Sequence, residues 1–400
     1  MQHVPAPSTD PTSAAAHGGI VEKYTLRRLW AAALQRPLWL ADGLQRERQD
    51  NYLLLRHIAA ALLIYSHSYA LAPVPAARGE ADLIAGVLPG FYGGKIAVLL
   101  FFAISGFLVT NSYLRQPHVL RFVAARVLRI YPAYVVCLLL TVLATGFCFT
   151  TLTLREFFAS SITWSYLFHN LGLTGLHYTL PGAYDASHYA GVANGSLWSL
   201  ALEARLYLYL AVLALCGFFR MRMLAAALLL LAVIAVLVAW PQLAPDAEGK
   251  RALTTVFAFT AAAACAARWF PVSTRLLVAI VALSWLLRDT ALAYGLTIAC
   301  ISYFTFWFAY RVPPIPLRLP GDYSYGLFLY GFPVQQALVQ LDPQIGAGQL
   351  TLEALLVALL LAVLSWHAIE RRALALKRAR VQTMADLKAE HHGISLDGKA

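Results

Sequence analysis

The sequence predicts an all-α, polytopic integral membrane protein with about ten transmembrane helices and both termini in the cytoplasm. Two features of the composition predict the membrane setting: 60% of the 400 residues are hydrophobic, and only 13% are charged. Soluble domains carry about 25% charged residues. The third observation is that the chain has room for about ten apolar runs of roughly twenty residues, each long enough to span a hydrocarbon core of about 30 Å.

Charge and cysteine content exclude several other classes. The net charge of +11 does not indicate a nucleic-acid partner, because the cationic residues are distributed between apolar segments, where they act as topology signals. The five cysteines lie in apolar segments without CxxC spacing, which favours buried free thiols over disulfides or metal ligands. The histidines outside the apolar segments are too far apart in sequence to predict a metal site.

The chain divides into two tails and one membrane domain. Residues 1–50 form a cytoplasmic N-terminal tail, in which 21–40 is expected to lie as an amphipathic helix on the inner membrane surface. Residues 373–400 form a cytoplasmic C-terminal tail. Between them, 51–372 is the transmembrane domain, with expected spans at 52–71, 95–113, 130–150, 196–219, 223–240, 253–267, 276–287, 290–310, 323–341 and 351–369.

The distribution of positive charge sets the orientation. Most of the 31 Lys and Arg residues fall in the tails and in the connections on their side of the membrane, which places both termini in the cytoplasm. One outer connection is long, at 151–195. It contains an apolar aromatic stretch, 157–173, for which we expect a re-entrant or interfacial helix rather than an eleventh span. No internal repeat is evident, which disfavours an inverted-repeat transporter.

Ionisable residues inside the spans are the candidate functional residues, because they are costly at membrane depth. Arg56 and His67 lie eleven residues apart in the first span, hence about three turns apart on one face. Glu203 is the only carboxylate expected well inside a span, and its depth matches that of His67. A carboxylate beside a histidine suits general-base catalysis. The alternative is a buried histidine and glutamate that only fix helix packing.

Two further motifs are candidates for ligand binding. Arg126 and Arg129, in RVLRIYPAY, are three residues apart at the cytoplasmic end of the third span. Such a pair suits the phosphates of a cytosolic ligand, although arginines there also simply hold topology. Ser105 and Gly106, in FFAISGFLVT, allow close approach of a helix or of a thin ligand arm, and helix packing alone explains them equally well.

Several segments together resemble the membrane-bound acyltransferase-3 family. They are the Arg56/His67 pair, FFAISGFLVT, RVLRIYP, NGSLWSLALEARLYL, GDYSYGLFLYGFPVQQ and SWHAIERR, which occur in family order over 51–372. The resemblance implies an enzyme of the bacterial inner membrane. Such an enzyme moves an acyl group, usually acetyl, from cytosolic acyl-coenzyme A to a hydroxyl of an envelope carbohydrate, such as exopolysaccharide, O-antigen or glycolipid, on the far side.

The resemblance also implies roles for individual residues. His67 is implied as the catalytic histidine with Arg56 in the same motif, Glu203 as the acidic residue after SLW, and Arg126 and Arg129 as donor-binding residues. The pantetheine arm of acetyl-CoA would then pass Ser105 and Gly106. No metal is implied.

The sequence departs from the family pattern in two places. His57 follows Arg56 where a small residue is commoner, which leaves the role of His57 open. Tyr330 and Gly331 precede the proline of YGFPVQQ where many relatives have a histidine.

Several alternatives stay open at this stage. A transporter of a lipid-linked sugar would not require an acyl donor, and a non-catalytic scaffold would tolerate loss of both His67 and Glu203. Within the enzyme class, succinyl transfer is an alternative to acetyl transfer. The sequence does not distinguish direct transfer from an acyl-histidine intermediate, and it does not identify the acceptor or the oligomeric state.

Overall fold

The computed structural model describes residues 37–45, 50–72, 82–88, 90–243, 248–290, 292–315 and 320–376. Their contacts divide the chain into two compact units. The smaller unit combines Arg268–Ile315 with the described residues up to Asn51, and the larger unit combines Tyr52–Ala267 with the described residues after Pro316.

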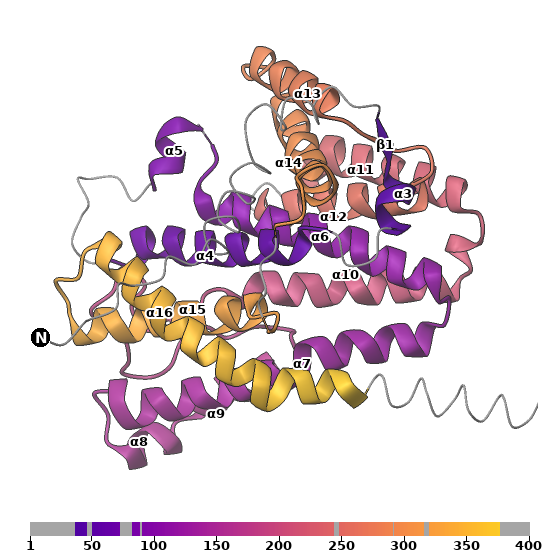
Figure 1. The fold of residues 1–400 in the computed structure, drawn as a ribbon. Coiled ribbons are helices and arrows are strands. Elements are labelled where there is room, and N and C mark those ends of the chain that lie inside the picture. The colour runs from indigo at the N-terminus through magenta and orange to yellow at the C-terminus, as the bar shows by residue number, and fades with distance from the viewer. Residues whose placement is uncertain are drawn as a thin grey trace, which may run out of the picture. The chain divides into compact units, whose positions relative to one another are not determined.

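The larger unit is a helical bundle, and each apolar segment expected in it is a helix (Figure 1). Four short elements stand in its connections: α5 (Leu83–Val87), α8 (Leu154–Ala159), α9 (Ser161–Leu171) and the 3-10 turn η2 (Phe218–Arg220). The long helices are α4 (Tyr52–Leu71), α6 (Gly93–Arg115), α7 (Val119–Ala144) continued by the π-helical turn η1 (Thr145–Phe149), α10 (Leu197–Leu215), α11 (Arg222–Leu243), α12 (Glu248–Cys265), α15 (Ser324–Leu341), and α16 (Ala347–Ser365) continued by the π-helical turn η4 (Trp366–Glu370).

Five helices among the described residues are long and apolar enough to cross a membrane: Gly93–Arg115, Val119–Phe149, Leu197–Leu215, Ala293–Tyr310 and Ala347–Leu376. The mainly helical, membrane-type fold is thus supported, whereas the count of ten spans and the side of the termini stay predictions. Helices α4 and α15 reach 20 and 18 residues. Their sequences contain polar side chains, and several of these build the site described below.

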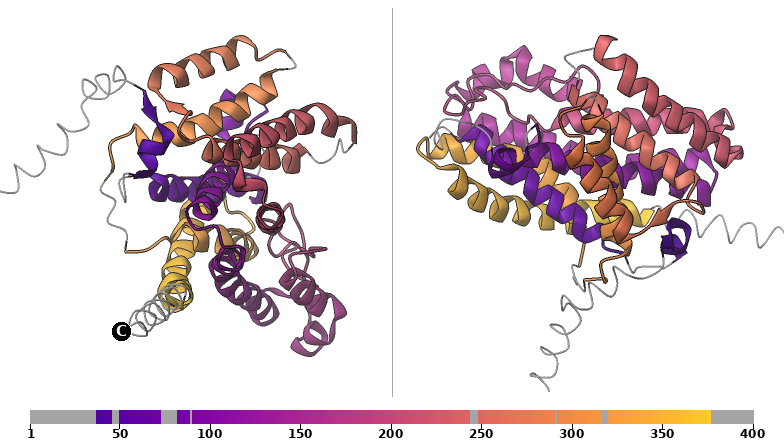
Figure 2. Two further views of the ribbon diagram at one scale, coloured as in Figure 1. Left: turned by 90° about the vertical axis from the view of Figure 1, so that its right-hand side faces the viewer. Right: turned by 90° about the horizontal axis from the view of Figure 1, so that it is seen from above.

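Close helix crossings in the bundle depend on small residues. Gly106 on α6 lies against the backbone of Phe257 on α12, so closely that a Cβ there would overlap it. Gly326 on α15 lies against Ala362 on α16, and Gly331 on α15 lies against Ile64 on α4. Figure 2 shows α15 and α16 side by side from a second direction. Small residues at crossings let helix backbones approach, as is typical of membrane bundles.

The long connection between α7 and α10 is compact. At 11 residues, α9 is about 16 Å long, too short to cross a hydrocarbon core of about 30 Å. The 157–173 stretch is therefore not an additional spanning helix. The connection is fastened to α15: Asn194 Nδ2 donates to Leu329 O (3.1 Å), and Gln336 Nε2 donates to Val192 O (2.6 Å).

The smaller unit contains a helix pair, α13 (Thr274–Leu286) and α14 (Ala293–Tyr310), and a two-stranded antiparallel sheet that the sequence did not predict. Strand β1 (Leu38–Trp39) leads into α3 (Leu40–Gln45) and pairs with β2 (Pro271–Val272). Of the expected interfacial helix at 21–40, only the last four residues are described, and two of them form β1. The rest of that helix and the C-terminal tail beyond residue 376 lie outside the described residues.

Candidate functional site

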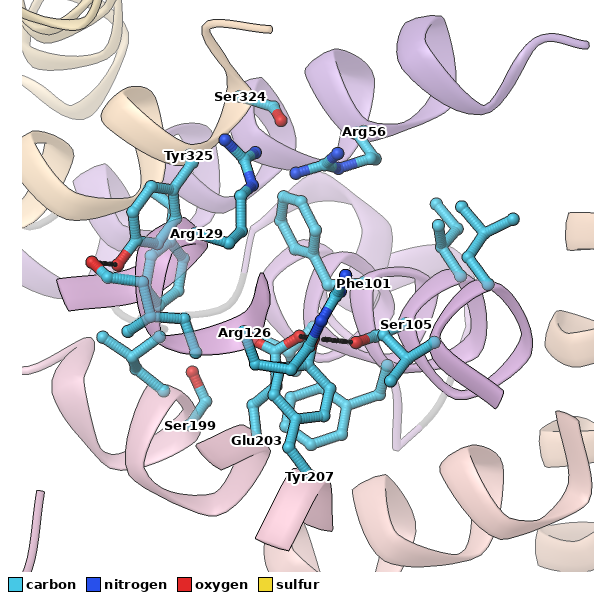
Figure 3. A pocket seen from close by; sticks show the side chains of 18 residues that line it. Arg56, Phe101, Ser105, Arg126, Arg129, Ser199, Glu203, Tyr207, Ser324 and Tyr325 are labelled. Atoms are coloured by element: carbon cyan, nitrogen blue, oxygen red, sulfur yellow. Dashed lines mark hydrogen bonds between the residues drawn. The ribbon is translucent and has the colours of Figure 1, made fainter. Parts of the chain in front are cut away.

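A first cavity, of about 130 Å³, lies inside the larger unit and is lined by side chains of α4, α6, α7, α10 and α15. We call it the basic cavity, because Arg56, Arg126 and Arg129 line it together with one carboxylate, Glu203. Figure 3 shows the guanidinium groups of Arg56 and Arg129 in one part of the cavity, and Arg126 with Glu203 in another. The three arginines expected from the sequence are therefore brought together.

Two of these arginines are held by buried carboxylates. Arg56 Nη1 and Arg129 Nη2 both donate to Asp322 Oδ2, at 2.6 and 2.8 Å, and Arg129 Nη1 donates to Glu370 Oε2 at 3.0 Å. The Glu370 side chain is only 2% exposed. Ser324 Oγ donates to the other oxygen of Asp322 at 2.5 Å. This ion-pair network joins α4, α7, the start of α15 and η4.

Asp322 lies two residues before Ser324, the first residue of α15, and its neighbours determine its ionisation. Burial alone would raise the pKa of this carboxyl, but the guanidinium groups of Arg56 and Arg129 outweigh burial and hold the pKa well below its usual range. Asp322 is therefore an anion at neutral pH and neutralises part of the positive charge of the basic cavity.

The third arginine has a different environment. The guanidinium of Arg126 lies over the ring of Tyr207, 5.8 Å from its centroid, a cation–π contact. Its Nε is buried and has no hydrogen-bond partner among the described residues, and within the same residues it forms no ion pair. A buried donor without a partner is costly. Of the three arginines in this cavity, Arg126 is therefore the one with an N–H group available to a ligand.

Glu203 is engaged by two hydroxyl groups. Ser105 Oγ donates to Glu203 Oε1 at 2.6 Å, and the Tyr207 hydroxyl, one turn further along α10, donates to the same oxygen at 2.5 Å. The Ser105 and Tyr207 hydroxyls also contact each other. The resulting three-residue cluster links α6 to α10 beside Arg126.

A second cavity, of about 480 Å³, contains His67. We call it the histidine cavity. The His67 ring lies edge-to-face against Phe332 on α15, with the centroids 5.3 Å apart. Tyr92, Tyr189 and Trp198 add aromatic surface to the lining. Ser196 also lines this cavity, and its buried Oγ has no hydrogen-bond partner within the described part of the chain.

The two cavities adjoin. Val98, Ser199 and Phe328 line both of them. The cationic groups and the histidine are therefore in neighbouring chambers separated by a wall to which α6, α10 and α15 each contribute one of these residues.

Comparison with known proteins gives two relatives. The chain is similar to an O-acetyl transferase of Shigella phage Sf6, with 29% identity over 341 residues that cover 79% of this chain and 93% of the relative. It is also similar to nodulation protein 10 of Rhizobium leguminosarum bv. viciae, with 28% identity over 376 residues that cover 83% of this chain and 95% of the relative. Together the two relatives support an O-acetyltransferase-type family for this chain. No protein-family model and no solved structure matches it.

The expected pairing of His67 with Glu203 is not observed in the structure. The two residues line different cavities, and the hydrogen bonds of Glu203 go to Ser105 and Tyr207. Equal depth in the membrane places His67 and Glu203 at the same level along the bundle axis. It does not determine whether their side chains point toward each other. Glu203 is better placed to act on the Arg126 side of the wall than to orient the imidazole.

Ser105 and Gly106, expected to border a ligand arm, have separate positions. Ser105 lines the basic cavity and binds Glu203. Gly106, the next residue on the helix, packs against α12. Packing alone accounts for this glycine, and the structure does not place it at the cavity wall.

Sequence reasoning missed the carboxylates of the ion-pair network and left His57 without a role. Asp322 and Glu370 lie within GDYSYG and SWHAIERR, whose place in the family order was the available signal. His57 Nδ1 hydrogen-bonds to Leu53 O (2.7 Å), and its Nε2 accepts from the backbone N–H of Tyr323 (3.2 Å). His57 therefore holds the start of α15 against α4, beside the Arg56–Asp322 ion pair.

Proposed function

We propose that this chain is an O-acetyltransferase that moves an acetyl group from acetyl-coenzyme A, bound at the basic cavity, to a carbohydrate hydroxyl in the histidine cavity. The observation that carries the proposal is the wall shared by the two cavities, because it brings an anion-binding chamber next to a candidate base. The similarity to the phage O-acetyl transferase supports acetyl as the group transferred.

Charge and size support the basic cavity as the donor site. Coenzyme A carries several negative charges, and Arg126 offers a guanidinium without a carboxylate partner among the described residues. A volume of about 130 Å³ corresponds to roughly four waters of liquid. This is too little for a whole coenzyme A molecule, so its phosphates meet the arginines from outside the cavity and only the acyl end of the pantetheine arm enters.

His67 supplies the chemistry in this proposal. Its imidazole accepts the proton of the acceptor hydroxyl while that oxygen attacks the thioester carbonyl. The carbon–oxygen ester bond forms, the carbon–sulfur bond breaks, and the proton passes from the imidazolium to the leaving thiolate. In the two-step alternative, the imidazole nitrogen takes the acyl group with release of the thiol, and the hydroxyl then takes it from the histidine.

The histidine cavity suits a sugar acceptor. Its volume of about 480 Å³ is within the range of small-molecule sites, and Tyr92, Tyr189 and Trp198 offer ring faces against which a sugar can pack. We infer an envelope or exported carbohydrate, such as exopolysaccharide, O-antigen or glycolipid. We further infer a bacterial inner-membrane protein of about ten spans with cytoplasmic termini, in which Arg56 is on the cytoplasmic side of His67.

The test is mass spectrometry of envelope carbohydrate from cells that carry the intact protein, the His67→Ala variant, or neither. The matched control is His188→Ala, which removes an exposed histidine of the outer connection. We expect the acyl mass increment with the intact protein and with His188→Ala but not with His67→Ala. Full modification by an inserted His67→Ala protein would refute the role of His67. No increment from the intact, inserted protein would favour transport of a lipid-linked sugar.

A further inference from the structure

The wall between the two cavities is built from one residue of each of three helices: Val98 of α6, Ser199 of α10 and Phe328 of α15. On each helix, this residue is the point at which the lining changes from one cavity to the other. Along α10, its N-cap Ser196 lines only the histidine cavity, and Glu203 lines only the basic cavity. On α15, the order is Ser324 in the basic cavity, Phe328 in both, and Phe332 in the histidine cavity.

We propose that these three residues frame the passage through which the acyl group reaches His67, and that the Phe328 side chain limits the length of acyl chain transferred. The inference rests on the proposed function. It concerns the size of the acyl pocket, on which the sequence is silent.

Phe328 is the member of the wall that can move. Val98 is β-branched and therefore stiff at χ1. Ser199 is 3% exposed, and its Oγ donates to Ser196 O at 3.2 Å, which turns the hydroxyl back onto its own helix. The Phe328 ring has a larger range of orientations, because two side-chain torsions determine its position and it borders a cavity on each side.

The helix that carries Phe328 is itself held in place. Gly326 lies against the backbone and Cβ of Ala362 of α16, and Gly331 lies against the side chain of Ile64 of α4, so a shift of α15 toward either helix would cause overlap. Phe101 packs edge-to-face on the Phe328 ring, with the centroids 6.2 Å apart. The passage therefore opens by rotation of the ring, and its width is set by the space the ring can vacate.

The distance to the histidine also fits a short acyl group. Phe332, in contact with His67, is four residues beyond Phe328, or about 6 Å along the helix. A thioester that has just passed the ring is thus about one helical turn from the level of His67. A longer acyl chain would meet Phe332 and the imidazole before its carbonyl cleared the wall.

The experiment uses membrane vesicles that contain the full-length protein and carbohydrate acceptor from the same cells. Labelled acetyl-CoA and labelled butyryl-CoA are supplied separately, and label in the carbohydrate fraction gives the ratio of butyryl to acetyl transfer. Each extra methylene in a confined apolar site commonly changes the rate by about tenfold or more. We therefore expect Phe328→Ala to raise the ratio at least about tenfold, and Phe328→Leu to raise it less.

Two further variants serve as a control and as a converse test. Phe168→Ala removes a phenyl group that is 63% exposed on α9 and lines neither cavity, and it should leave the ratio unchanged. Val98→Phe narrows the passage and should lower acetyl transfer at least about tenfold. Normal acetyl transfer with an unchanged ratio in both Phe328 variants would overturn this inference alone. No acetyl transfer by the unaltered protein would overturn the proposed function, and this inference with it.

Discussion

Replacing Asp322 by Asn removes the charge that holds Arg56 and Arg129 together while keeping the size of the side chain. Asp322 Oδ2 accepts a hydrogen bond from each of the two guanidinium groups, at 2.6 and 2.8 Å. The Asp322 side chain is only 16% exposed. Removing one partner of a buried ion pair costs about 3–5 kcal/mol. The arginine side chains keep 25% and 18% exposure, so we expect the lower end, about 3 kcal/mol.

The assay is reversible chemical unfolding of the purified protein in detergent, with helix content as the signal. Glu248→Gln is the matched control: it breaks the Lys95–Glu248 ion pair (2.8 Å), in which the Glu248 side chain is 55% exposed. Exposed pairs contribute at most about 1 kcal/mol. Equal losses of unfolding free energy in the two variants would contradict the structural role given to Asp322.

The difference in unfolding free energy between the intact protein and Asp322→Asn should depend on pH, and the sign of that dependence follows from the pKa of Asp322. The pKa of Asp322 is lowered by its two arginines, so its contribution is present above the ordinary carboxyl pKa of about 3.9 and is lost as the pH falls through the lower folded-state value. The difference between the intact protein and Asp322→Asn should therefore be constant from about pH 5 to 8 and shrink only below about pH 4. A difference that shrinks between pH 7 and 5 would refute this reasoning.

Two further predictions concern helix packing and the charge of the basic cavity. Gly106→Ala places a methyl group against the backbone of Phe257 and should lower the unfolding free energy by about 1–3 kcal/mol; Gly348→Ala, where the space is open, should raise it by up to about 1 kcal/mol. Glu203→Gln keeps an oxygen that accepts from Ser105 but removes a negative charge near the donor. It should favour donor binding by about 1 kcal/mol, measured as a several-fold lower KM for acetyl-CoA in the vesicle assay, and an unchanged KM would place the donor elsewhere.

The helical segments could be predicted from the sequence because each contains a long apolar run. The first span was expected at 52–71, and α4 has those bounds. The third helix begins eleven residues before the expected 130, because Val119–Arg129 contains three arginines that hydropathy excludes although they continue the same helix. Strand β1 was missed because two residues carry no periodicity.

Within the site, the sequence predicted which residues are charged and at what depth, but not which of them meet. Depth counting paired His67 with Glu203, whereas packing directs Glu203 to a hydroxyl pair in the other cavity. The Arg129–Asp322 contact joins residues 193 positions apart, and no local pattern specifies it. Such pairings depend on how the helices rotate about their axes, which only tertiary packing determines.

Helix α15 also fixes the distance between the ion-pair network and His67. Its first residue, Ser324, is hydrogen-bonded to the anion that anchors Arg56 and Arg129, and Phe332, which touches His67, is eight residues further on. Eight residues of helix measure about 12 Å, and the glycine crossings keep α15 from tilting. On the proposed mechanism, a donor whose acyl group is too close to its anionic head cannot reach from the basic cavity to His67. Preference for a long-armed carrier over a small acyl phosphate would then follow from the length of one helix rather than from any single contact.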